Sequence, residues 1–284
     1  MSESELSTAF REVLRPSVVM VLARKPDVDP DLVGVGTGCI IGYMRGNGGP
    51  PRAIVATAGH VLRHNADELL EVTVVRETTE GQGGRVATVM SDQVDKDGSY
   101  IVFYRDMSSL DLGFIVVPHE CPDGQRFLSE DEGGQPTEHG TEVMQPHLLV
   151  TEGTQVAWAG YPRGVHQRLG ERVLCYYEGV VSATYNDPDS PMYIIDGHTD
   201  NGVSGGPVWV WNEQRTGGAR AQLVGVITEY YESHDDNEEG TAGFQEEETE
   251  RRPGFVIAVP HNPLIRYMQE RYAHGQVDAS KSAA

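Results

Sequence analysis

The chain has 284 residues, and 43 acidic against 22 basic side chains give it a formal net charge of −21 at pH 7. A negative electrostatic field repels nucleic acids and anionic membranes, so neither is expected as a partner. The charge could attract basic proteins, or it could serve only for solubility or for life in a salty habitat. The length suits one large domain or two small ones. The longest apolar stretch, residues 18–23, is far too short to span a bilayer.

The start of the chain and its cysteines indicate the cytoplasm. Residues 1–5 are acidic and lack the basic and apolar regions of a signal peptide. Three widely spaced cysteines do not suggest a disulfide framework, and they are Cys39, Cys121 and Cys175. We therefore expect a cytoplasmic protein that is not inserted in a membrane.

In chain order, a short helix and a β-rich unit come first and extend over residues 1–118. Leu6, Phe10 and Leu14 recur every four residues, which predicts a helix over 4–14. Short β-branched segments broken by Gly and Asp turns follow, and they predict a barrel. Strands are expected at 17–25, 71–76 and 100–104.

An apolar run at residues 53–58 ends in small residues and a histidine. It predicts a buried strand followed by a turn that presents His60. His64 lies four residues later, a spacing that suits two metal ligands on a helix. The glutamate of the His-Glu-x-x-His pattern is absent, however, so no metal is expected.

A carboxylate stands at the head of the next apolar run. Asp111 lies at the head of the apolar strand expected in residues 110–117, where a carboxylate is costly unless it is hydrogen-bonded. The N–H of His60 is a suitable partner. Asp97 and Asp106 compete for the same role, but both lie in polar turns, so Asp111 is preferred.

Residues 119–148 are polar and rich in Gly, Pro and Glu, which predicts a linker between two barrels. A second β-rich unit with a closing amphipathic helix is expected over 149–275, and a tail over 276–284. The helix is indicated by Leu264, Ile265, Met268 and Tyr272.

The turn at residues 200–207, Asp-Asn-Gly-Val-Ser-Gly-Gly-Pro, carries a candidate nucleophile. Its small residues let the N–H groups of Gly202 and Ser204 converge on one point, where they would hold the oxyanion of a tetrahedral intermediate. The alternative is an ordinary glycine-rich hairpin turn. With His60 as the base and Asp111 as its orienting acid, the chain order is His, Asp, Ser.

Seven segments carry these features in a fixed order. The most specific are Thr57-Ala58-Gly59-His60-Val61, Leu110-Asp111-Leu112-Gly113 and Gly202-Val203-Ser204-Gly205-Gly206-Pro207. The others are 34–41, 156–164, 223–228 and 253–260. Together they resemble the trypsin-like, chymotrypsin-fold serine proteases, and most closely the bacterial HtrA/DegP-type protease domain. Val203 departs from the family pattern, and with 24 residues after Pro260 no PDZ domain is expected.

The resemblance implies an all-β fold of two antiparallel Greek-key barrels of the chymotrypsin type, with a short N-terminal and a C-terminal helix. It implies a serine endopeptidase that acts on a protein or peptide through His60, Asp111 and Ser204, with an acyl-enzyme intermediate and no cofactor. By analogy it would be a regulated intracellular bacterial protease of stress or defence. The alternatives are a pseudoprotease that holds a partner without cutting it, and an esterase with the same triad.

The resemblance also implies a substrate cleft. His198, six residues before Ser204, corresponds to the floor of the specificity pocket, although a buried structural histidine is the other interpretation. Ten acids in residues 229–250 form either a solvated loop or a cleft rim that favours basic substrates. Substrate-binding residues are expected at His198, Thr228, Glu229 and Gly254.

Two tryptophans alternate after the nucleophile turn. Trp209 and Trp211 could form a ligand platform, but packing in a core or between the barrels is the preferred interpretation.

Overall fold

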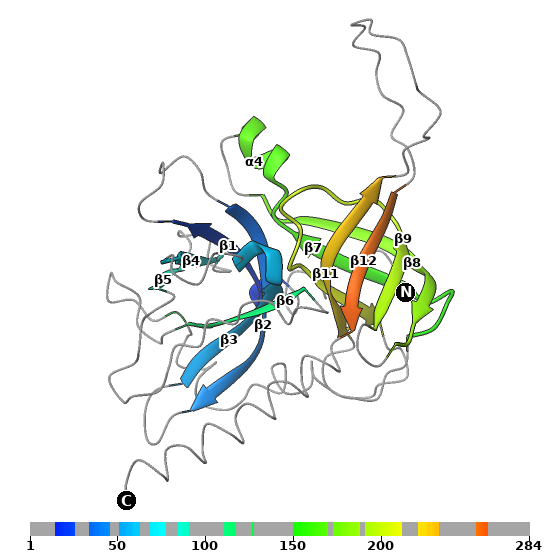
Figure 1. Ribbon diagram of the computed structural model, residues 1–284, viewed down its shortest axis with the longest axis horizontal. Coiled ribbons are helices and arrows are strands. Elements are labelled where there is room, and N and C mark those ends of the chain that lie inside the picture. Colours follow the sequence, from blue (N-terminus) through cyan, green and yellow to red (C-terminus); the bar gives the residue numbers. More distant parts are fainter. Residues whose placement is uncertain are drawn as a thin grey trace, which may run out of the picture.

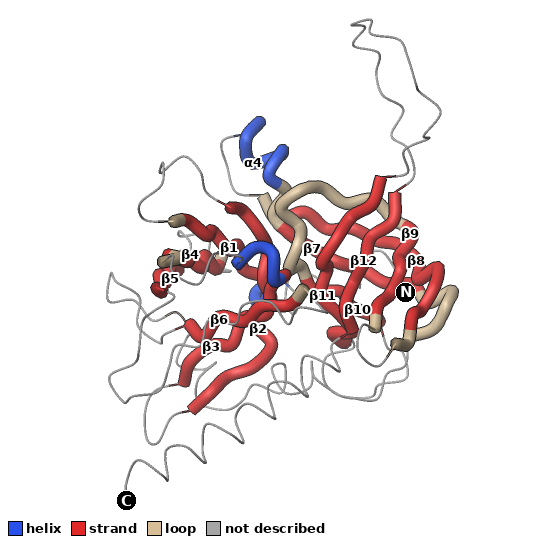
Figure 2. Tube along the Cα trace, in the orientation of Figure 1, coloured by secondary structure: helices blue, strands red, loops and turns tan. Residues whose placement is uncertain are grey.

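The computed structural model describes residues 15–25, 34–45, 51–62, 69–77, 85–90, 111–117, 127, 150–169, 173–187, 191–211, 221–232 and 254–260. Within these residues the protein is mostly β-strand, arranged as two six-stranded sheets that lie side by side (Figures 1 and 2). The helices predicted at 4–14 and 263–274 and the strand predicted at 100–104 lie outside the described residues, as does the predicted linker apart from Phe127. No helix in the described part of the chain is long and apolar enough to cross a membrane.

The first sheet is antiparallel throughout and has the strand order β5-β4-β1-β2-β3-β6. Its predicted strands are confirmed wherever they fall on described residues. In spatial order the strands are β5 Arg85–Met90, β4 Glu71–Arg76, β1 Val18–Arg24, β2 Gly34–Arg45, β3 Pro51–Ala58 and β6 Leu112–Val117. The short helical turns η2 (Arg15–Ser17) and η3 (Gly59–Leu62) flank β1 and β3.

The second sheet closes into a barrel in the order β10-β11-β12-β9-β8-β7. Closure pairs every strand on both sides and leaves no free edge. The strands are β10 Pro207–Trp211, β11 Ala221–Glu232, β12 Gly254–Pro260, β9 Met192–Asp196, β8 Cys175–Tyr185 and β7 Gln155–Gly160. A helix, α4 (Arg163–Leu169), follows β7 and lies at the top of Figure 1.

Strands β1 and β6 of the first sheet are largely buried on both faces because the two faces belong to different cores. In β1, Val19 and Val21 point into the core of the first sheet, whereas Val18 and Met20 point into a core shared with the barrel. A strand that is buried on both sides needs a continuous apolar sequence rather than an alternating one, and β6 is buried at every position. The shared core joins the two sheets into one body.

The two tryptophans belong to that shared core. Trp209 is buried there, and Trp211 is partly buried against it. Packing between the barrels is therefore the correct interpretation of the Trp-x-Trp pattern.

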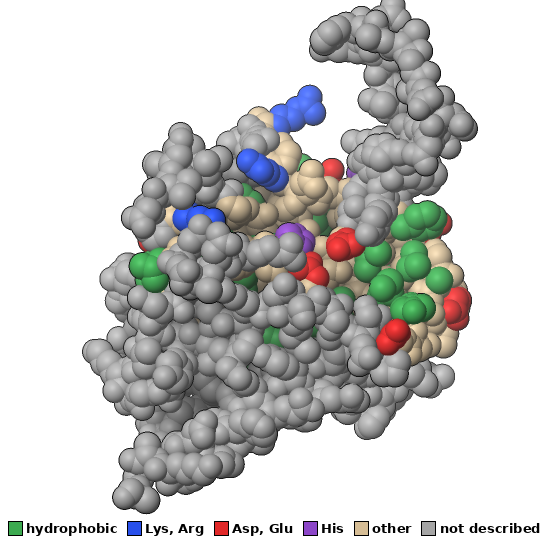
Figure 3. Space-filling view, viewed as in Figure 1, with side chains coloured by type: hydrophobic (Ala, Val, Ile, Leu, Met, Phe, Trp, Pro, Cys, Tyr) green, Lys and Arg blue, Asp and Glu red, His purple; other side chains and the backbone are tan. Residues whose placement is uncertain are grey.

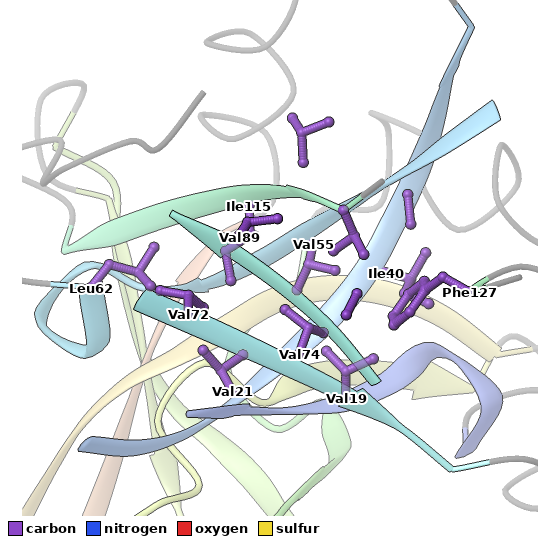
Figure 4. Close-up of a cluster of buried hydrophobic side chains, with 14 of the residues drawn as sticks. Val19, Val21, Ile40, Val55, Leu62, Val72, Val74, Val89, Ile115 and Phe127 are labelled. Carbon is purple, nitrogen blue, oxygen red and sulfur yellow. The ribbon is translucent and has the colours of Figure 1, made fainter. Parts of the chain in front are cut away.

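Phe127 lies in the chain between β6 and β7, and its side chain is fully buried in the core of the first sheet. Figure 4 shows its ring beside Ile40. Its carbonyl oxygen accepts hydrogen bonds from Nη1 of Arg76 and from Nη1 of Arg85, both at 3.3 Å. Those two arginines are directly opposite each other on β4 and β5. Like charges in that position repel, and the shared carbonyl offsets the repulsion.

We expect Phe127→Ala to lower the free energy of unfolding by about 3–5 kcal/mol, the usual cost of emptying a buried phenylalanine site. Urea titration followed by circular dichroism measures the change. Leu69→Ala is the control, because Leu69 is 42% exposed and its truncation should cost less than about 0.5 kcal/mol. Equal effects of the two substitutions would show that Phe127 is not a core residue.

Candidate active site

The pairing of β3 with β6 brings the candidate base to the candidate acid. The register pairs Ala58, the last residue of β3, with Leu112, so the next residue in the chain, Gly59, lies opposite Asp111. There the N–H of Gly59 donates to the carbonyl oxygen of Asp111 at 2.6 Å. The chain then turns into η3, which presents the exposed His60, as predicted.

Asp111 binds His60 with both carboxylate oxygens. The backbone N–H of His60 donates to Oδ1 at 2.8 Å, and Nδ1 of its ring lies 2.7 Å from Oδ2. A proton held on Nδ1 leaves Nε2 as the free, basic nitrogen. The two side chains are 40% and 20% exposed, so the pair faces a partly open site. The predicted Asp111–His60 contact is present, whereas Asp97, Asp106 and His64 lie outside the described residues.

The backbone at Asp111 is in the left-handed region, with φ at 47°. Among non-glycine residues, aspartate and asparagine tolerate this region best. In this conformation the carbonyl of Asp111 and both oxygens of its own carboxylate face the turn that carries His60. The acid therefore holds the turn as well as the ring.

The Ser204 turn depends on glycine at two positions. Gly202 has a φ of 98° and Gly205 a φ of 91°. A Cβ atom on Gly202 would lie 2.6 Å from the carbonyl oxygen of Tyr161, and one on Gly205 would overlap the carbonyl oxygen of Thr37. Larger residues would therefore be strained at both positions and would clash as well.

The amides of this turn fall into two groups. Val203 N–H donates to the Asp200 carbonyl at 3.2 Å, and Gly205 N–H donates to that of Ile227 at 2.7 Å. Within the described residues, the N–H groups of Gly202 and Ser204 donate to no other backbone group. These two N–H groups, one of them on the candidate nucleophile itself, are therefore available to bind a developing oxyanion.

Thr37 joins this turn to the first sheet. Its N–H donates to the carbonyl oxygen of Ser204 at 2.8 Å, and its hydroxyl donates to that of Gly202 at 2.8 Å. The hydroxyl also accepts from Tyr161 N–H at 2.9 Å, while the Thr37 carbonyl accepts from the Thr57 hydroxyl at 2.7 Å. Thr37 lies in the motif segment 34–41, but the sequence pattern did not predict a role for it in the site. The available signal was a hydroxyl in an otherwise apolar strand.

These contacts place the serine turn beside the histidine turn. A Cβ on Gly205 would lie 3.0 Å from the Ala58 nitrogen, and a Cβ on Gly36 would touch both Val61 and the Ser204 carbonyl. No hydrogen bond joins the side chains of His60 and Ser204 within the described residues. In enzymes without substrate such bonds are often long, and they tighten in the complex.

His198 is exposed, so the interpretation as a buried structural histidine is wrong. Its Nε2 lies 3.7 Å from Oδ1 of Asp200, and Oδ2 of Asp200 accepts a hydrogen bond from the Tyr177 hydroxyl at 3.1 Å. The Tyr177 ring stacks on Trp158 with centroids 5.8 Å apart. Burial, and then the Asp200 carboxylate, raise the pKa of Tyr177 above its usual value, so its hydroxyl stays a donor.

The other expected substrate-binding residues lie along the β11–β12 ladder. Thr228 is buried, and its hydroxyl donates to the Ile257 carbonyl at 3.4 Å, so only its backbone can meet a substrate. Glu229 is exposed. Gly254 pairs with Glu232, four residues beyond Thr228, or about 13 Å of strand. The structure therefore does not bring Gly254 together with Thr228.

Two cysteines lie among the described residues, and both are free. Burial raises the pKa of Cys39 to about 12 and also raises the pKa of Cys175. A thiol with a raised pKa is a poor nucleophile at neutral pH. Neither cysteine competes with Ser204 for that role.

Comparison with known proteins agrees with this geometry. A sequence profile for a family described as the trypsin-like peptidase domain matches residues 36–216, well over half of the chain. No match was found among curated proteins. A Glu endopeptidase solved in complex with MPD is 15% identical, with a TM-score of 0.50 over 92% of this chain and 94% of that one. The protease Anisep from Arthrobacter nicotinovorans is also 15% identical, with a TM-score of 0.48 over 86% and 90%. The predicted double β-barrel of the chymotrypsin type is confirmed.

Proposed function

The chain belongs to the trypsin-like peptidase domain family and is a serine endopeptidase, and on that premise we propose that Ser204, His60 and Asp111 are its catalytic triad. The observation that carries the proposal is the double hydrogen bond from His60 to Asp111, at 2.8 and 2.7 Å, beside a glycine-bounded serine turn. The proposed oxyanion hole consists of the N–H groups of Gly202 and Ser204.

In the proposed reaction, Oγ of Ser204 attacks the carbonyl carbon of the scissile peptide while Nε2 of His60 takes the hydroxyl proton. The N–H groups of Gly202 and Ser204 bind the oxyanion, and each such donor is typically worth about 3 kcal/mol of barrier. The C–N bond then breaks as His60 gives its proton to the leaving amine. Water, deprotonated by the same histidine, attacks the acyl-enzyme, releases the acid product and restores Ser204. Asp111 holds the ring and stabilises the imidazolium throughout.

A fluorophosphonate probe tests the proposal directly, because it phosphonylates only an activated serine. The probe should label the wild-type protein, and peptide mass spectrometry should locate the label on Ser204. His60→Ala should prevent labelling. A folded protein that stays unlabelled would be a pseudoprotease, and a label on another serine would move the nucleophile. Digestion of a peptide library then separates a peptidase from an esterase.

We further propose that basic residues near the scissile bond favour cleavage. The support is the acidic segment 229–250, which begins at the exposed Glu229, and the chain's net charge of −21. Exposed carboxylates attract cations weakly, by about a few tenths of a kcal/mol each, and salt screens them over about 8 Å at physiological ionic strength.

The preference for Arg or Lys in a peptide-library digest should therefore weaken as salt rises. It should also shrink when residues 233–250 are replaced by a short Gly/Ser turn. The control is the cleavage rate of the best neutral peptide, which salt should change little. The proposal would be wrong if the cleaved peptides were not enriched in Arg or Lys, or if neither salt nor replacement of residues 233–250 changed that enrichment. The acidic segment would then be a solvated loop without a role in specificity.

The proposal extends to a regulated bacterial protease of the cytoplasm, acting in stress or defence by analogy with its family. The free thiols of Cys39 and Cys175 support a reducing compartment.

A further inference from the structure

The second barrel has a well-defined inside where β8, β9 and β12 meet. The register aligns Val181 with Ile195, and Ile195 with Val256. All three side chains are buried in the core of the barrel. Because side chains alternate along a strand, the neighbouring residues on each strand must point outward.

The outward row beside this one is partly apolar. Phe255 pairs with Asp196, and Asp196 pairs with Val180, so a carboxylate stands between two apolar side chains. Phe255 is 44% exposed and Val180 is 39% exposed. Val180 lies within β8, whereas Asp196 ends β9 and Phe255 is the second residue of β12. Both exposed fractions are high for large apolar side chains in paired strands.

The next rows extend the same surface. Ile257 pairs with Ile194, and both are partly exposed. Tyr185, farther along β8, is 53% exposed. Figure 3 shows apolar side chains gathered over β8, β9 and β12, with acidic side chains at their margin. We call this surface the outer patch; it comprises Val180, Tyr185, Ile194, Asp196, Phe255 and Ile257.

Among the described residues of the barrel, the aspartates and glutamates are not accompanied by any lysine or arginine. The described residues of the barrel, 150–162 and those from 173 to 260, include seven acids and no lysine or arginine. The described lysines and arginines belong to the first sheet, its flanks and α4. The acids are Glu152, Glu178, Asp187, Asp196, Asp200, Glu229 and Glu232.

We propose that the outer patch is a docking surface for a basic, amphipathic protein segment. Apolar side chains of the partner would cover Phe255, Val180 and Ile194, and a lysine or arginine would reach Asp196 between them. An interface of this kind has an apolar centre and a charged rim that selects the partner. The outer patch includes none of the three proposed triad residues, so the proposed role of this surface is to recruit a protein rather than to take part in cleavage.

The structure and the charge disfavour two other occupants. A partner cannot add a strand here, because β8, β9 and β12 are interior strands of a closed barrel. A second copy of the chain would bring another −21 charges and another acidic barrel to the same surface. A basic segment meets neither obstacle.

The test uses the Ser204→Ala protein, so that probes are bound and not cut. Three fluorescein-labelled helical peptides of 18 residues are compared by anisotropy: one of Leu and Lys, one of Leu and Glu, and one of Ser and Lys. We expect the Leu/Lys peptide to bind at least tenfold more tightly than either of the others, and to weaken as salt rises. Equal binding of the Leu/Glu peptide would overturn the proposal.

Paired variants then locate the binding surface. Phe255→Ser should weaken binding of the Leu/Lys peptide at least fivefold, while Leu69→Ser, at a similarly exposed position just before β4, should not. Val180→Ser, at the other end of the row, is a second test should Phe255→Ser fail to fold. Asp196→Asn should weaken binding, whereas Glu77→Gln, which removes the same charge just after β4, where Glu77 pairs with Arg15, should not.

Two results would overturn the proposal. Equal losses from Phe255→Ser and Leu69→Ser would mean that the peptide binds any exposed apolar residue. A dimer seen by sedimentation and abolished by Phe255→Ser would mean that a second copy covers the surface. Because binding is measured in Ser204→Ala protein, its failure says nothing against the catalytic proposal.

Discussion

Ser204→Ala is expected to lower kcat for peptide hydrolysis by about 10⁶-fold, the size of effect seen when a triad nucleophile is removed. The turn should survive, because it is held by backbone bonds such as Thr37 N–H to the Ser204 carbonyl, at 2.8 Å. The melting temperature should therefore stay within about 2 °C of wild type, because substitutions that leave packing intact change the free energy of unfolding by less than about 0.5 kcal/mol. Single-turnover assays with a cleavable peptide measure the loss.

Ser182→Ala is the matched control, because it removes the hydroxyl of an exposed serine on β8. It should leave both kcat and the melting temperature unchanged. Wild-type turnover by Ser204→Ala would make the triad assignment wrong, even though the family and fold would stand.

Asp111→Asn is expected to lower kcat by about 10⁴-fold. Asparagine also tolerates the left-handed backbone of this position, where φ is 47°, so the turn should keep its shape. The amide oxygen can still accept from the His60 N–H, but the amide NH₂ would then face Nδ1 of the ring. A donor at that place moves the ring proton to Nε2, and His60 can no longer deprotonate the serine.

The loss is measured as kcat on the best library peptide, with circular dichroism to show that the fold is kept. Glu178→Gln removes an exposed carboxylate on β8 and should leave kcat unchanged. A large loss in Asp106→Asn together with none in Asp111→Asn would transfer the role of the acid to Asp106.

Thr37 explains how a site can be divided between two sheets. His60 and Asp111 both belong to the first sheet, whereas Ser204 belongs to a turn of the second. Three hydrogen bonds of 2.8–2.9 Å at the buried Thr37 tie that turn and Tyr161 to the first sheet. Buried polar groups that are fully paired fix one arrangement, because any shift would leave some of them unsatisfied. The hydrophobic core shared by the two sheets also helps to fix their relative position.

The chain's own patterns determined a good deal about this protein. Apolar runs predicted β1, β3 and β6, because a strand buried on both faces needs an uninterrupted apolar sequence, and β-branched residues predicted β4. The sequence also predicted the serine turn, because the residues that form it lie within one short motif. Gly202, Ser204 and Gly205 are close neighbours in the chain, and a positive φ at glycine is a local property.

Only the tertiary structure decided how distant residues meet. His60 and Asp111 are 51 positions apart, and Thr37 and Gly202 are 165 apart. Those contacts follow from strand register and from the packing of one sheet on the other, which the composition of either segment does not specify. For the same reason the exposure of His198, the buried Phe127 and the outward row of Val180, Asp196 and Phe255 were visible only in the folded chain.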